Sequence, residues 1–351
     1  MKQLIILIGI FAFSITNAKS QDIHFSQMAM SPLTLNPALT GAVYDFQANV
    51  NYRNQWLTVG EAYQTISASA DTKLNFNYKH NKKAYFAVGV DFYHDRAGLV
   101  TVASNNFNLH LATHIVLTEH STLGLGVQTG YGLRSIDYSA ARWGSQYDGY
   151  QFNPLLSSGE AAVGTSFGYF DVGAGMVYRY SKFDSRIGQN DRFSLTAGFA
   201  AYHLNRPAYS FQGHGGEKLY MRFTGFVNFD IGIHNSHSIL QPAIYFFQQG
   251  PAREIMIGMY WKYMLVEDSR ITNFINQTSI AGGLFYRNQD ALVAKFIFDW
   301  RGMGIGFSYD FNVFNSLIQA SKSVGAFEIA LRYVIPDWTR RPYISGGRSQ
   351  F

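Results

Sequence analysis

The chain of 351 residues is poor in charge: Asp, Glu, Lys and Arg make up 15%, against roughly 25% in soluble domains, whereas aromatic residues reach 16%. The net charge of +5 is scattered, without a basic stripe with interleaved aromatic residues, which argues against nucleic-acid binding. The absence of cysteine excludes disulfides, thiolate metal sites and cysteine nucleophiles, and a mean hydropathy of −0.07 argues against a bundle of membrane-spanning helices.

Residues 1–20 are predicted to be a secretory signal peptide. Lys2 precedes an apolar run over residues 4–13, and the small residues Ala18 and Ser20 suit signal peptidase. The run is too short to cross a bilayer as a helix, which takes about 20 residues. We therefore expect the mature chain to start at Gln21; an N-terminal membrane anchor is the alternative.

Residues 21–42 are predicted to form a separate periplasmic or lumen segment. The sequence QDIHFSQMAMSPLTLNPALTGA lacks the alternation of a strand and contains Pro32 and Pro37, which push the residues before them toward extended backbone. Two placements are open from the residues alone: a plug or cap folded into a barrel lumen, or a loosely ordered periplasmic tail. The candidate plug or partner-binding residues here are Gln21, His24, Phe25, Asn36 and Pro37.

Residues 43–335 are predicted to form an outer-membrane barrel, because they alternate with the two-residue period of strands. In GLGVQTGYGLR (124–134), the apolar residues Leu125, Val127 and Tyr131 share one face, and glycine or polar residues occupy the other. The pattern recurs at 172–180, 303–311 and 327–335. One such strand would also fit a soluble sandwich. Many long ones, with glycine and charge on the second face, predict apolar faces toward lipid and polar faces toward a lumen.

The predicted fold class is a transmembrane antiparallel β-barrel of about fourteen strands with a short N-terminal plug or cap. No later stretch offers about 18 uninterrupted apolar residues, and lipid does not tolerate open sheet edges, so the sheet must close. An even strand number places both barrel ends in the periplasm. The predicted strands are 43–56, 62–70, 83–96, 101–117, 122–138, 168–181, 192–203, 218–233, 237–248, 253–265, 278–287, 291–300, 303–312 and 324–334. Residues 336–351 are left as a C-terminal tail.

Glycine and aromatic residues add two expectations about the wall. Inward glycines such as Gly124, Gly126, Gly304 and Gly306 leave space for bulky inward side chains or the N-terminal segment, which favours a plugged or narrow barrel. Aromatic residues near predicted strand ends are interpreted as girdles at the membrane interfaces. They are Tyr52, Trp56, Tyr85, Phe86, Tyr260, Trp261, Tyr263, Phe296, Phe298 and Trp300.

No catalytic, cofactor or metal site is predicted, and we expect no enzyme. Asp91, His94 and Asp95 cluster in VDFYHDRAG, but the histidine falls on the other strand face, which favours a polar lumen cluster over an acid–base or metal site. His110 and His114 are roughly 13 Å apart along a strand and cannot share a metal, so we predict them to be polar lumen residues. A phosphate-binding glycine loop and a nucleophile elbow are both missing.

Motifs along the chain resemble the PorP/SprF family of type IX secretion system outer-membrane proteins from Bacteroidetes-type bacteria. The resemblance covers about residues 21–333. It departs from the family at Ile23, where proline is usual, and in the long basic tail. The motifs are QDIHFSQ (21–27), LNPALTG (35–41), YRNQW (52–56), GYGLRSIDYS (130–139), DVGAGMVYRY (171–180), AYHLNRP (201–207), GGLFYRNQDA (282–291), GFSYDFNV (306–313) and GAFEIALRY (325–333).

The resemblance implies an outer-membrane protein of the type IX secretion and gliding motility machinery, which binds and helps to export or surface-anchor a secreted protein with a C-terminal sorting domain. The implied partners are that adhesin or cargo, periplasmic peptidoglycan-associated or motor components, and outer-membrane lipids. The AYHLNRP motif marks Asn205, Arg206 and Pro207 as candidate partner-binding residues, with shaping of the loop as the other interpretation. The alternative function is an outer-membrane diffusion channel or transporter of small solutes.

Overall fold

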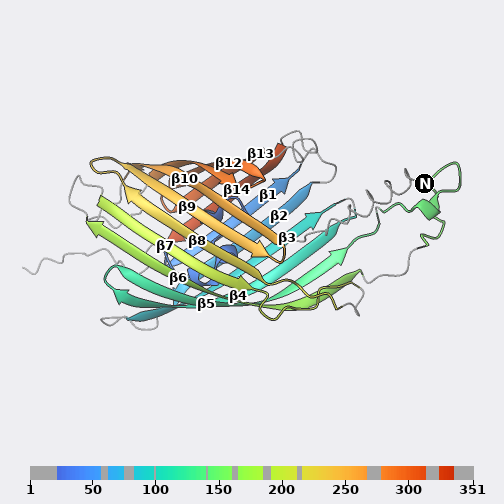
Figure 1. The fold of residues 1–351 in the computed structure, drawn as a ribbon, viewed down its shortest axis with the longest axis horizontal. Coiled ribbons are helices and arrows are strands. Elements are labelled where there is room, and N and C mark those ends of the chain that lie inside the picture. Colours follow the sequence, from blue (N-terminus) through green and yellow to red (C-terminus); the bar gives the residue numbers. More distant parts are fainter. Residues whose placement is uncertain are drawn as a thin grey trace, which may run out of the picture.

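Fourteen antiparallel strands close into a barrel in which each strand pairs with its sequence neighbours and β1 pairs with β14 (Figure 1). The predicted barrel is thus confirmed. The structure, a computed structural model, describes residues 22–56, 62–74, 83–98, 100–139, 141–159, 165–184, 191–211, 216–266, 278–313 and 324–335; the predicted signal peptide, Gln21 and the C-terminal tail lie outside these ranges. The strands are β1 (Phe46–Gln55), β2 (Tyr63–Leu74), β3 (Ala84–Ala97), β4 (Val102–Thr118), β5 (Ser121–Ile136), β6 (Ser166–Asp184), β7 (Asp191–Tyr202), β8 (Arg222–Gly232), β9 (Ser238–Gln249), β10 (Ala252–Val266), β11 (Thr278–Arg287), β12 (Ala291–Trp300), β13 (Met303–Asn312) and β14 (Val324–Ile335).

The two ends of the barrel differ in their connections. Strand β1 begins and β14 ends at one end, here named the terminal end, which carries the short turns 119–120, 233–237 and 301–302 and the longer connections 75–83, 185–190 and 267–277. The opposite end, named the loop end, carries the long connections 137–165, 203–221 and 313–323 and the short ones 98–101, 250–251 and 288–290. There the β5–β6 hairpin projects far beyond its neighbours (Figure 1). Bacterial barrels have short periplasmic turns and longer extracellular loops. The two longest connections, 137–165 and 203–221, and the position of both ends of the wall at the terminal end are typical of a barrel whose loop end faces the cell exterior.

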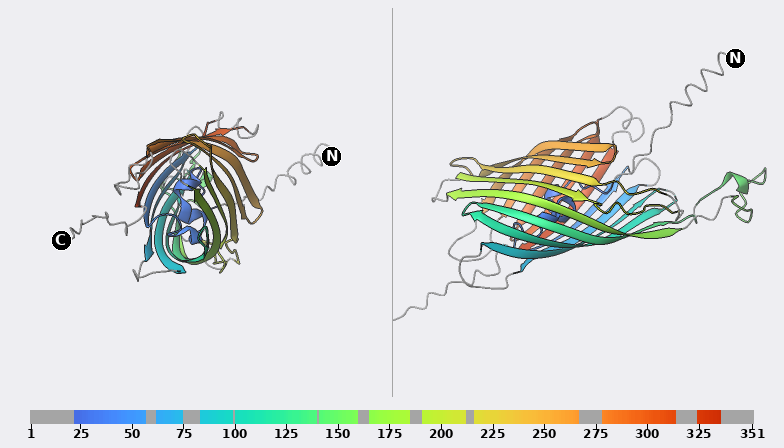
Figure 2. Two further views of the ribbon diagram at one scale, coloured as in Figure 1. Left: turned by 90° about the vertical axis from the view of Figure 1, so that its left-hand side faces the viewer. Right: turned by 60° about the horizontal axis from the view of Figure 1, so that its bottom comes forward.

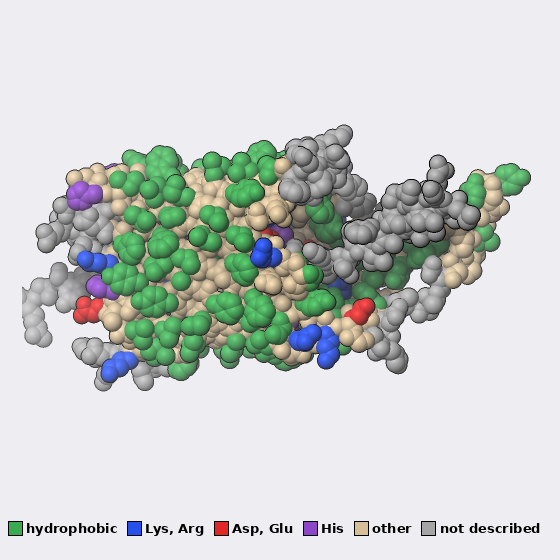
Figure 3. All heavy atoms as spheres, viewed as in Figure 1, with side chains coloured by type: hydrophobic (Ala, Val, Ile, Leu, Met, Phe, Trp, Pro, Cys, Tyr) green, Lys and Arg blue, Asp and Glu red, His purple; other side chains and the backbone are tan. Residues whose placement is uncertain are grey.

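The alternation of residues places apolar side chains on the outside of the wall. In β5, Leu125, Val127 and Tyr131 are exposed, whereas the intervening Gly124 and Gly126 are buried. Hydrophobic side chains cover the visible face of the wall, and the charged side chains on that face gather toward the two ends (Figure 3). This is the surface distribution of a barrel that is surrounded by lipid.

Two aromatic residues that were predicted to lie in the interface girdles point into the lumen instead. Tyr260 is 5% exposed and donates its hydroxyl to Gln27 Oε1 at 3.2 Å. The Tyr85 ring stacks on His114, with ring centroids 4.7 Å apart. The prediction was wrong for both because it used their closeness to strand ends and ignored which face of the strand they occupy. Trp261, one residue after Tyr260, is exposed as predicted.

Residues 22–45, here named the plug, run through the barrel lumen from the loop end to the terminal end (Figure 2). The backbone N–H of Asp22 donates to Gln249 Oε1 at 2.7 Å at the loop end. At the terminal end, the backbone N–H of Asp45 donates to the carbonyl of Ile335 at 3.0 Å. Of the two placements that the sequence left open, the segment therefore occupies the lumen. Within the described residues, every helix is too short or too polar to cross a membrane.

The plug folds into three short helical turns, η1 (Met28–Met30), α2 (Pro32–Leu35) and η2 (Pro37–Leu39). Pro32 and Pro37 each stand in the first turn, where the missing backbone N–H removes no helical hydrogen bond. Asn36 caps η2 by accepting a hydrogen bond from the backbone N–H of Ala38 at 2.8 Å. The turns bury apolar side chains in the centre of the lumen: Phe25, Met30, Leu33 and Ala38 are at most 1% exposed.

Inward glycines of the wall allow the plug to approach closely, as the sequence predicted. A Cβ atom added at Gly126 would lie 2.4 Å from the backbone nitrogen of Ala38, and one at Gly306 would lie 2.6 Å from Met30 Sδ. Real Cβ atoms do not come this close to other atoms. The wall and the plug therefore fit together only because these positions have no side chain.

We expect Gly126→Ala to destabilise the barrel by about 1–3 kcal/mol, because the new methyl group meets plug backbone that cannot rotate away. The measurement is the unfolding midpoint followed by the heat-dependent change in gel mobility of the barrel. Gly282→Ala is the matched control: it is also a strand glycine, but an added Cβ there meets no atom within 4 Å. Equal midpoint shifts in the two variants would contradict the close packing of the plug.

Candidate functional site

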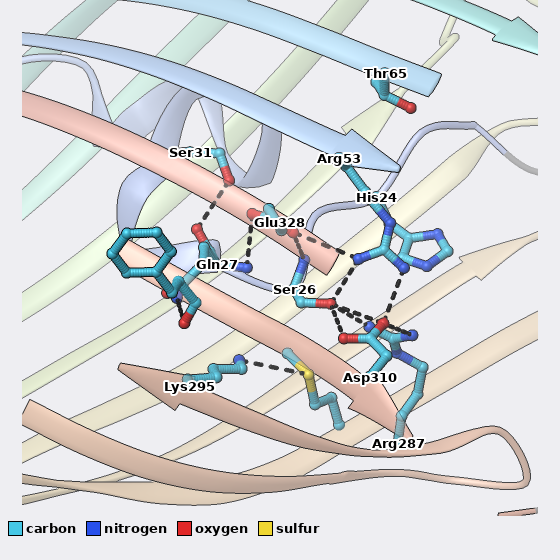
Figure 4. Close-up of polar contacts among 12 residues, drawn as sticks. His24, Ser26, Gln27, Ser31, Arg53, Thr65, Arg287, Lys295, Asp310 and Glu328 are labelled. Carbon is cyan, nitrogen blue, oxygen red and sulfur yellow. Dashed lines mark hydrogen bonds and ion pairs between the residues drawn. The ribbon is translucent and has the colours of Figure 1, made fainter. Parts of the chain in front are cut away.

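The plug is held near the loop end by a buried polar cluster, here named the central anchor, which consists of Ser26, Arg53, Arg287, Asp310 and Glu328 (Figure 4). Ser26 belongs to the plug, and the other four project inward from β1, β11, β13 and β14. The Ser26 hydroxyl donates to Asp310 Oδ1 at 2.9 Å. It also accepts hydrogen bonds from Arg53 Nη1 at 2.6 Å and Arg287 Nη2 at 2.8 Å. One plug hydroxyl thus joins three charged residues of the wall.

Glu328 binds the backbone of the plug. Its carboxylate oxygens accept hydrogen bonds from the backbone N–H of Ser26 at 2.6 Å and of Gln27 at 3.0 Å. Arg53 is the cross-strand partner of Glu328 where β1 meets β14, and its Nη1 lies 3.4 Å from the Glu328 carboxylate. Arg53 Nη2 lies 3.0 Å from Asp310 Oδ2. The cluster therefore holds the plug through its backbone N–H groups, and it spans the seam between the first and last strands.

The charges of the central anchor are paired, which is the condition for burying them. Arg287 Nη1 lies 2.9 Å from both Asp310 and Asp290, and Arg287 Nε lies 3.2 Å from Glu254. Ser26 is 0% exposed, so its hydroxyl is closed off from any substrate. The arrangement is thus suited to holding the plug in place and not to nucleophilic chemistry.

A second group, here named the mouth anchor, holds the start of the plug at the loop end and consists of Asp22, Asp171, His203, Arg222 and Gln249. His203 Nε2 lies 2.6 Å from Asp22 Oδ2, and His203 Nδ1 lies 2.8 Å from Asp171 Oδ1. Arg222 Nη1 lies 3.7 Å from the same Asp22 oxygen. His203 has a φ of 57°, a left-handed conformation that side chains rarely adopt. The fold thus accepts local backbone strain where the imidazole bridges the two carboxylates.

The protonation of His203 strengthens the mouth anchor. Burial alone would lower the pKa of His203, but the carboxylates of Asp22 and Asp171 raise it from 6.5 to about 10. The imidazole is therefore charged at neutral pH, and both ring nitrogens donate to carboxylates. A raised pKa means that this stabilisation is fully present below pH 6.5 and is lost as the pH rises toward 10.

We expect His203→Gln to lower the unfolding temperature of the detergent-solubilised barrel most between pH 5 and pH 6.5, because the wild-type imidazolium contributes fully there. The difference from wild type should narrow steadily from pH 6.5 to about pH 10. His120→Gln, in an exposed turn at the terminal end, is the control and should show no such trend. A difference that widens with pH would show that His203 is not charged in the folded barrel.

Further contacts hold the plug toward the terminal end, and most of them involve plug backbone. Asn36 Nδ2 donates to the carbonyl of Met176 at 3.0 Å. The remaining contacts are Thr224 Oγ1 to the carbonyl of Leu35 (2.7 Å), His114 Nε2 to the carbonyl of Thr40 (2.8 Å) and the backbone N–H of Gly41 to Asp71 Oδ2 (2.7 Å). The plug is thus fixed along its whole length.

The predicted plug residues lie at different points of this arrangement. His24 Nε2 comes within 3.8 Å of Glu254, beside the central anchor. Phe25 is 1% exposed, Asn36 binds Met176, and Pro37 opens η2. Gln21 lies outside the described residues. The structure therefore brings His24 and Phe25 close to the anchors, and places Asn36 and Pro37 deeper in the lumen.

Asn205, Arg206 and Pro207 lie in the loop that follows β7 at the loop end. Asn205 Nδ2 donates to the carbonyl of Phe170 at 2.6 Å, and the carbonyl of Pro207 accepts a hydrogen bond from the backbone N–H of Leu219 at 2.9 Å. Both residues therefore shape the loop. Arg206 is exposed and has a φ of 45°.

The anchor residues were not predicted from the sequence, although a signal for them was present. Each of Ser26, Arg53, Arg287, Asp310, Glu328, Asp171 and His203 lies within one of the motifs that resemble the family. In the wall, each is a polar residue on the inward face of a strand or directly after its end. Selecting polar residues inside those motifs would have found them. What the sequence alone does not give is their convergence on one segment.

The other polar lumen residues do not converge on a single site. His110 pairs with Asp91, and His114 binds the plug, so the prediction that they are separate polar lumen residues is confirmed. His94 contacts Asn105 at 2.8 Å, and Thr65 donates to Asp95 at 2.6 Å. Among the residues that the structure describes, no group of three or more His, Asp or Glu side chains is placed to hold a metal ion.

Comparison with known proteins gives one extensive match. The family model described as type IX secretion system membrane protein PorP/SprF matches residues 17–333. The search of curated proteins found no match.

Among solved structures, the chain is similar to a TodX deletion mutant, a monoaromatic hydrocarbon channel, with 10% identity, a TM-score of 0.47, and coverage of 87% of this chain and 94% of that one. It is also similar to the toluene transporter TbuX of Ralstonia pickettii, with 10% identity, a TM-score of 0.42 and the same coverages. A third similar structure is the KdgM porin, with 7% identity, a TM-score of 0.34, and coverage of 82% and 99%. Likenesses this distant say nothing about what the chain binds.

Proposed function

Because the chain belongs to the PorP/SprF family of type IX secretion system membrane proteins, we propose that it binds a secreted protein with a C-terminal sorting domain and helps to export it or to anchor it at the cell surface. The chain is an outer-membrane β-barrel of a secretion family and not of an enzyme family. The cargo binds at the loop end. Periplasmic peptidoglycan-associated or motor components contact the terminal end, and outer-membrane lipids surround the apolar wall.

The observation that carries this proposal is the anchored plug. A diffusion channel needs a continuous aqueous path, whereas this lumen holds a segment that is bonded to the wall from its first described residue to its last. Two cavities beside the start of the plug measure about 20 and 30 Å³, which is room for a few water molecules at most. The surface left for a large partner is therefore the exterior of the loop end and not the lumen.

The tip of the β5–β6 connection, residues 141–159, supports a binding role at that end. The tip contains η3 (Gly144–Gln146) and is ordered by its own hydrogen bonds, such as Gln146 Nε2 to the carbonyl of Leu156 at 3.0 Å. It nevertheless leaves Tyr150 94% exposed and Leu155 92% exposed. Large apolar side chains that a structured loop presents to water are typical of protein interaction sites.

The test is co-purification from native outer membranes after gentle detergent extraction of the tagged protein. We expect a large protein with a C-terminal sorting domain to co-purify with the wild type. The double variant Tyr150→Ser/Leu155→Ser should lose most of it, since both side chains are exposed and their replacement leaves the barrel intact. Ile233→Ser, an exposed apolar residue at the terminal end, is the matched control and should retain the cargo. Recovery of a lone barrel that conducts ions would instead support the channel function.

A further inference from the structure

We infer that the plug passes through the barrel from the exterior mouth, where Asp22 lies, to the periplasmic end, where the chain enters β1, so that the start of the plug can be reached from outside the cell. A segment that precedes the first strand of a barrel is ordinarily expected on the periplasmic side, because both ends of an even-stranded wall lie there. The inference does not depend on the cargo proposed above. It depends on the direction of the plug and on the sidedness of the barrel.

The contacts of the plug follow one direction without reversal. Asp22 binds Gln249, the last residue of β9, and His203, the first residue after β7, and both positions are at the loop end. Ser26 follows at the central anchor, beside Arg287, the last residue of β11.

Deeper in the lumen, Asn51 Nδ2 donates to the carbonyl of Met30 at 3.0 Å. Thr40 then meets His114, and Asp45 reaches Ile335 at the terminal end. The plug therefore descends from Asp22 at the loop end to Asp45 at the terminal end, where the chain enters β1.

The distribution of connections sets the sidedness. The two longest connections, 137–165 and 203–221, lie at the loop end, and the start of β1 and the end of β14 both lie at the terminal end. Two-residue turns occur at both ends, 119–120 and 301–302 at the terminal end and 250–251 at the loop end. Outer-membrane barrels carry short turns in the periplasm and long loops outside. Asp22 is thus at the exterior mouth, held by the protonated bridge of His203 and by Arg222. The mouth anchor fixes the exit point of the chain as well as the start of the plug.

An exterior chain start has a consequence for interaction. A partner that approaches the mouth from outside meets the start of the plug, where Asp22, Ile23 and His24 line a small cavity. The start of the plug is therefore part of the exterior interaction surface. An extension added to it would be displayed on the cell and would not enter the periplasm.

The absence of cysteine makes a direct labelling test possible. A Gly-Ser-Cys-Gly-Ser linker is inserted between Gln21 and Asp22, which keeps the new thiol clear of the wall. Tyr150→Cys reports the loop end, and Glu119→Cys, in an exposed turn, reports the terminal end. Intact and permeabilised cells are treated with a membrane-impermeant polyethylene glycol maleimide, and labelling is read as a shift in gel mobility of the unfolded protein.

We expect the linker cysteine and Tyr150→Cys to label to similar extents in intact cells, and Glu119→Cys to label only after permeabilisation. Labelling of the linker cysteine only after permeabilisation, with Tyr150→Cys labelled in intact cells, would place the chain start in the periplasm and overturn the inference. Labelling of Glu119→Cys in intact cells, with Tyr150→Cys protected, would reverse the sidedness and overturn it equally. The first outcome would leave the proposed binding of a sorting-domain protein untouched, whereas reversed sidedness would also contradict cargo binding at the loop end.

Discussion

A barrel that lacks residues 22–39 is expected to conduct ions at least about ten times better than the wild type in planar bilayers. The wall closes through hydrogen bonds between its own strands, so it should persist without the plug. Removal of the apolar core of the plug, which includes Phe25, Met30 and Leu33, leaves a lumen lined by polar and charged side chains together with apolar side chains of the wall, such as Met256 and Phe285. Such a lumen fills with water, as in porins of similar or larger strand number.

The comparison needs a deletion of similar size that does not touch the lumen. Removal of residues 144–156 from the exposed tip at the loop end serves this purpose, because its hydrogen bonds are internal to the tip. Its conductance should equal that of the wild type. Both deletions are first shown to be folded by their heat-dependent gel mobility. A folded barrel without residues 22–39 that conducts no better than wild type would show that the plug is not the barrier to ions.

Arg53→Met is expected to cost about 3–5 kcal/mol of stability, the range for breaking a buried ion pair by removal of one partner. Arg53 is 3% exposed and contacts Ser26, Asp310 and Glu328, so its loss removes the ion-pair partner that lies 3.4 Å from Glu328. Methionine fills much of the space without restoring the charge. The measurement is the urea midpoint of unfolding together with the single-channel record, in which a loosened plug should produce transient openings.

Arg253→Met in β10 is the matched control, because Arg253 is exposed and a surface charge contributes little to stability. Its free energy of unfolding, derived from the urea midpoint, should stay within about 0.5 kcal/mol of the wild-type value. Ser26→Ala provides a second comparison from the plug side, since it removes the hydroxyl that joins Arg53, Arg287 and Asp310. If Arg53→Met behaved like Arg253→Met, the central anchor would have no role in holding the plug.

The wall could be predicted closely from the sequence because its signal is local. The predicted strands 278–287, 291–300 and 303–312 coincide with β11, β12 and β13. A strand with one face in lipid must alternate, and alternation can be read from neighbouring residues. Tyr260 was predicted to lie in an interface girdle because it is close to a strand end. Its place on the inward face of β10 would have predicted its burial correctly.

The convergence of the anchor residues could not be predicted because it arises from closure of the sheet. Arg53, Arg287 and Asp310 lie far apart in sequence, and each alone is only a polar residue on an inward face. Their approach to Ser26 depends on the register of several strand pairs and on the path of the plug. The sequence also left the plug and the periplasmic tail equally open, since a proline-containing segment without alternation fits both.

Arg53 and Glu328 lie on neighbouring strands at the seam between β1 and β14, and this position couples two equilibria: the pairing of these strands and the binding of the plug in the lumen. These residues face each other where β1 pairs with β14. Their hydrogen bonds to Ser26 and Gln27 require both that β1 and β14 are paired and that the plug is bound in the lumen. Such bonds stabilise both states together, so each state raises the population of the other. A force that extracts the plug would therefore also weaken the pairing of β1 with β14. Conversely, a barrel that opens between β1 and β14 would release its plug.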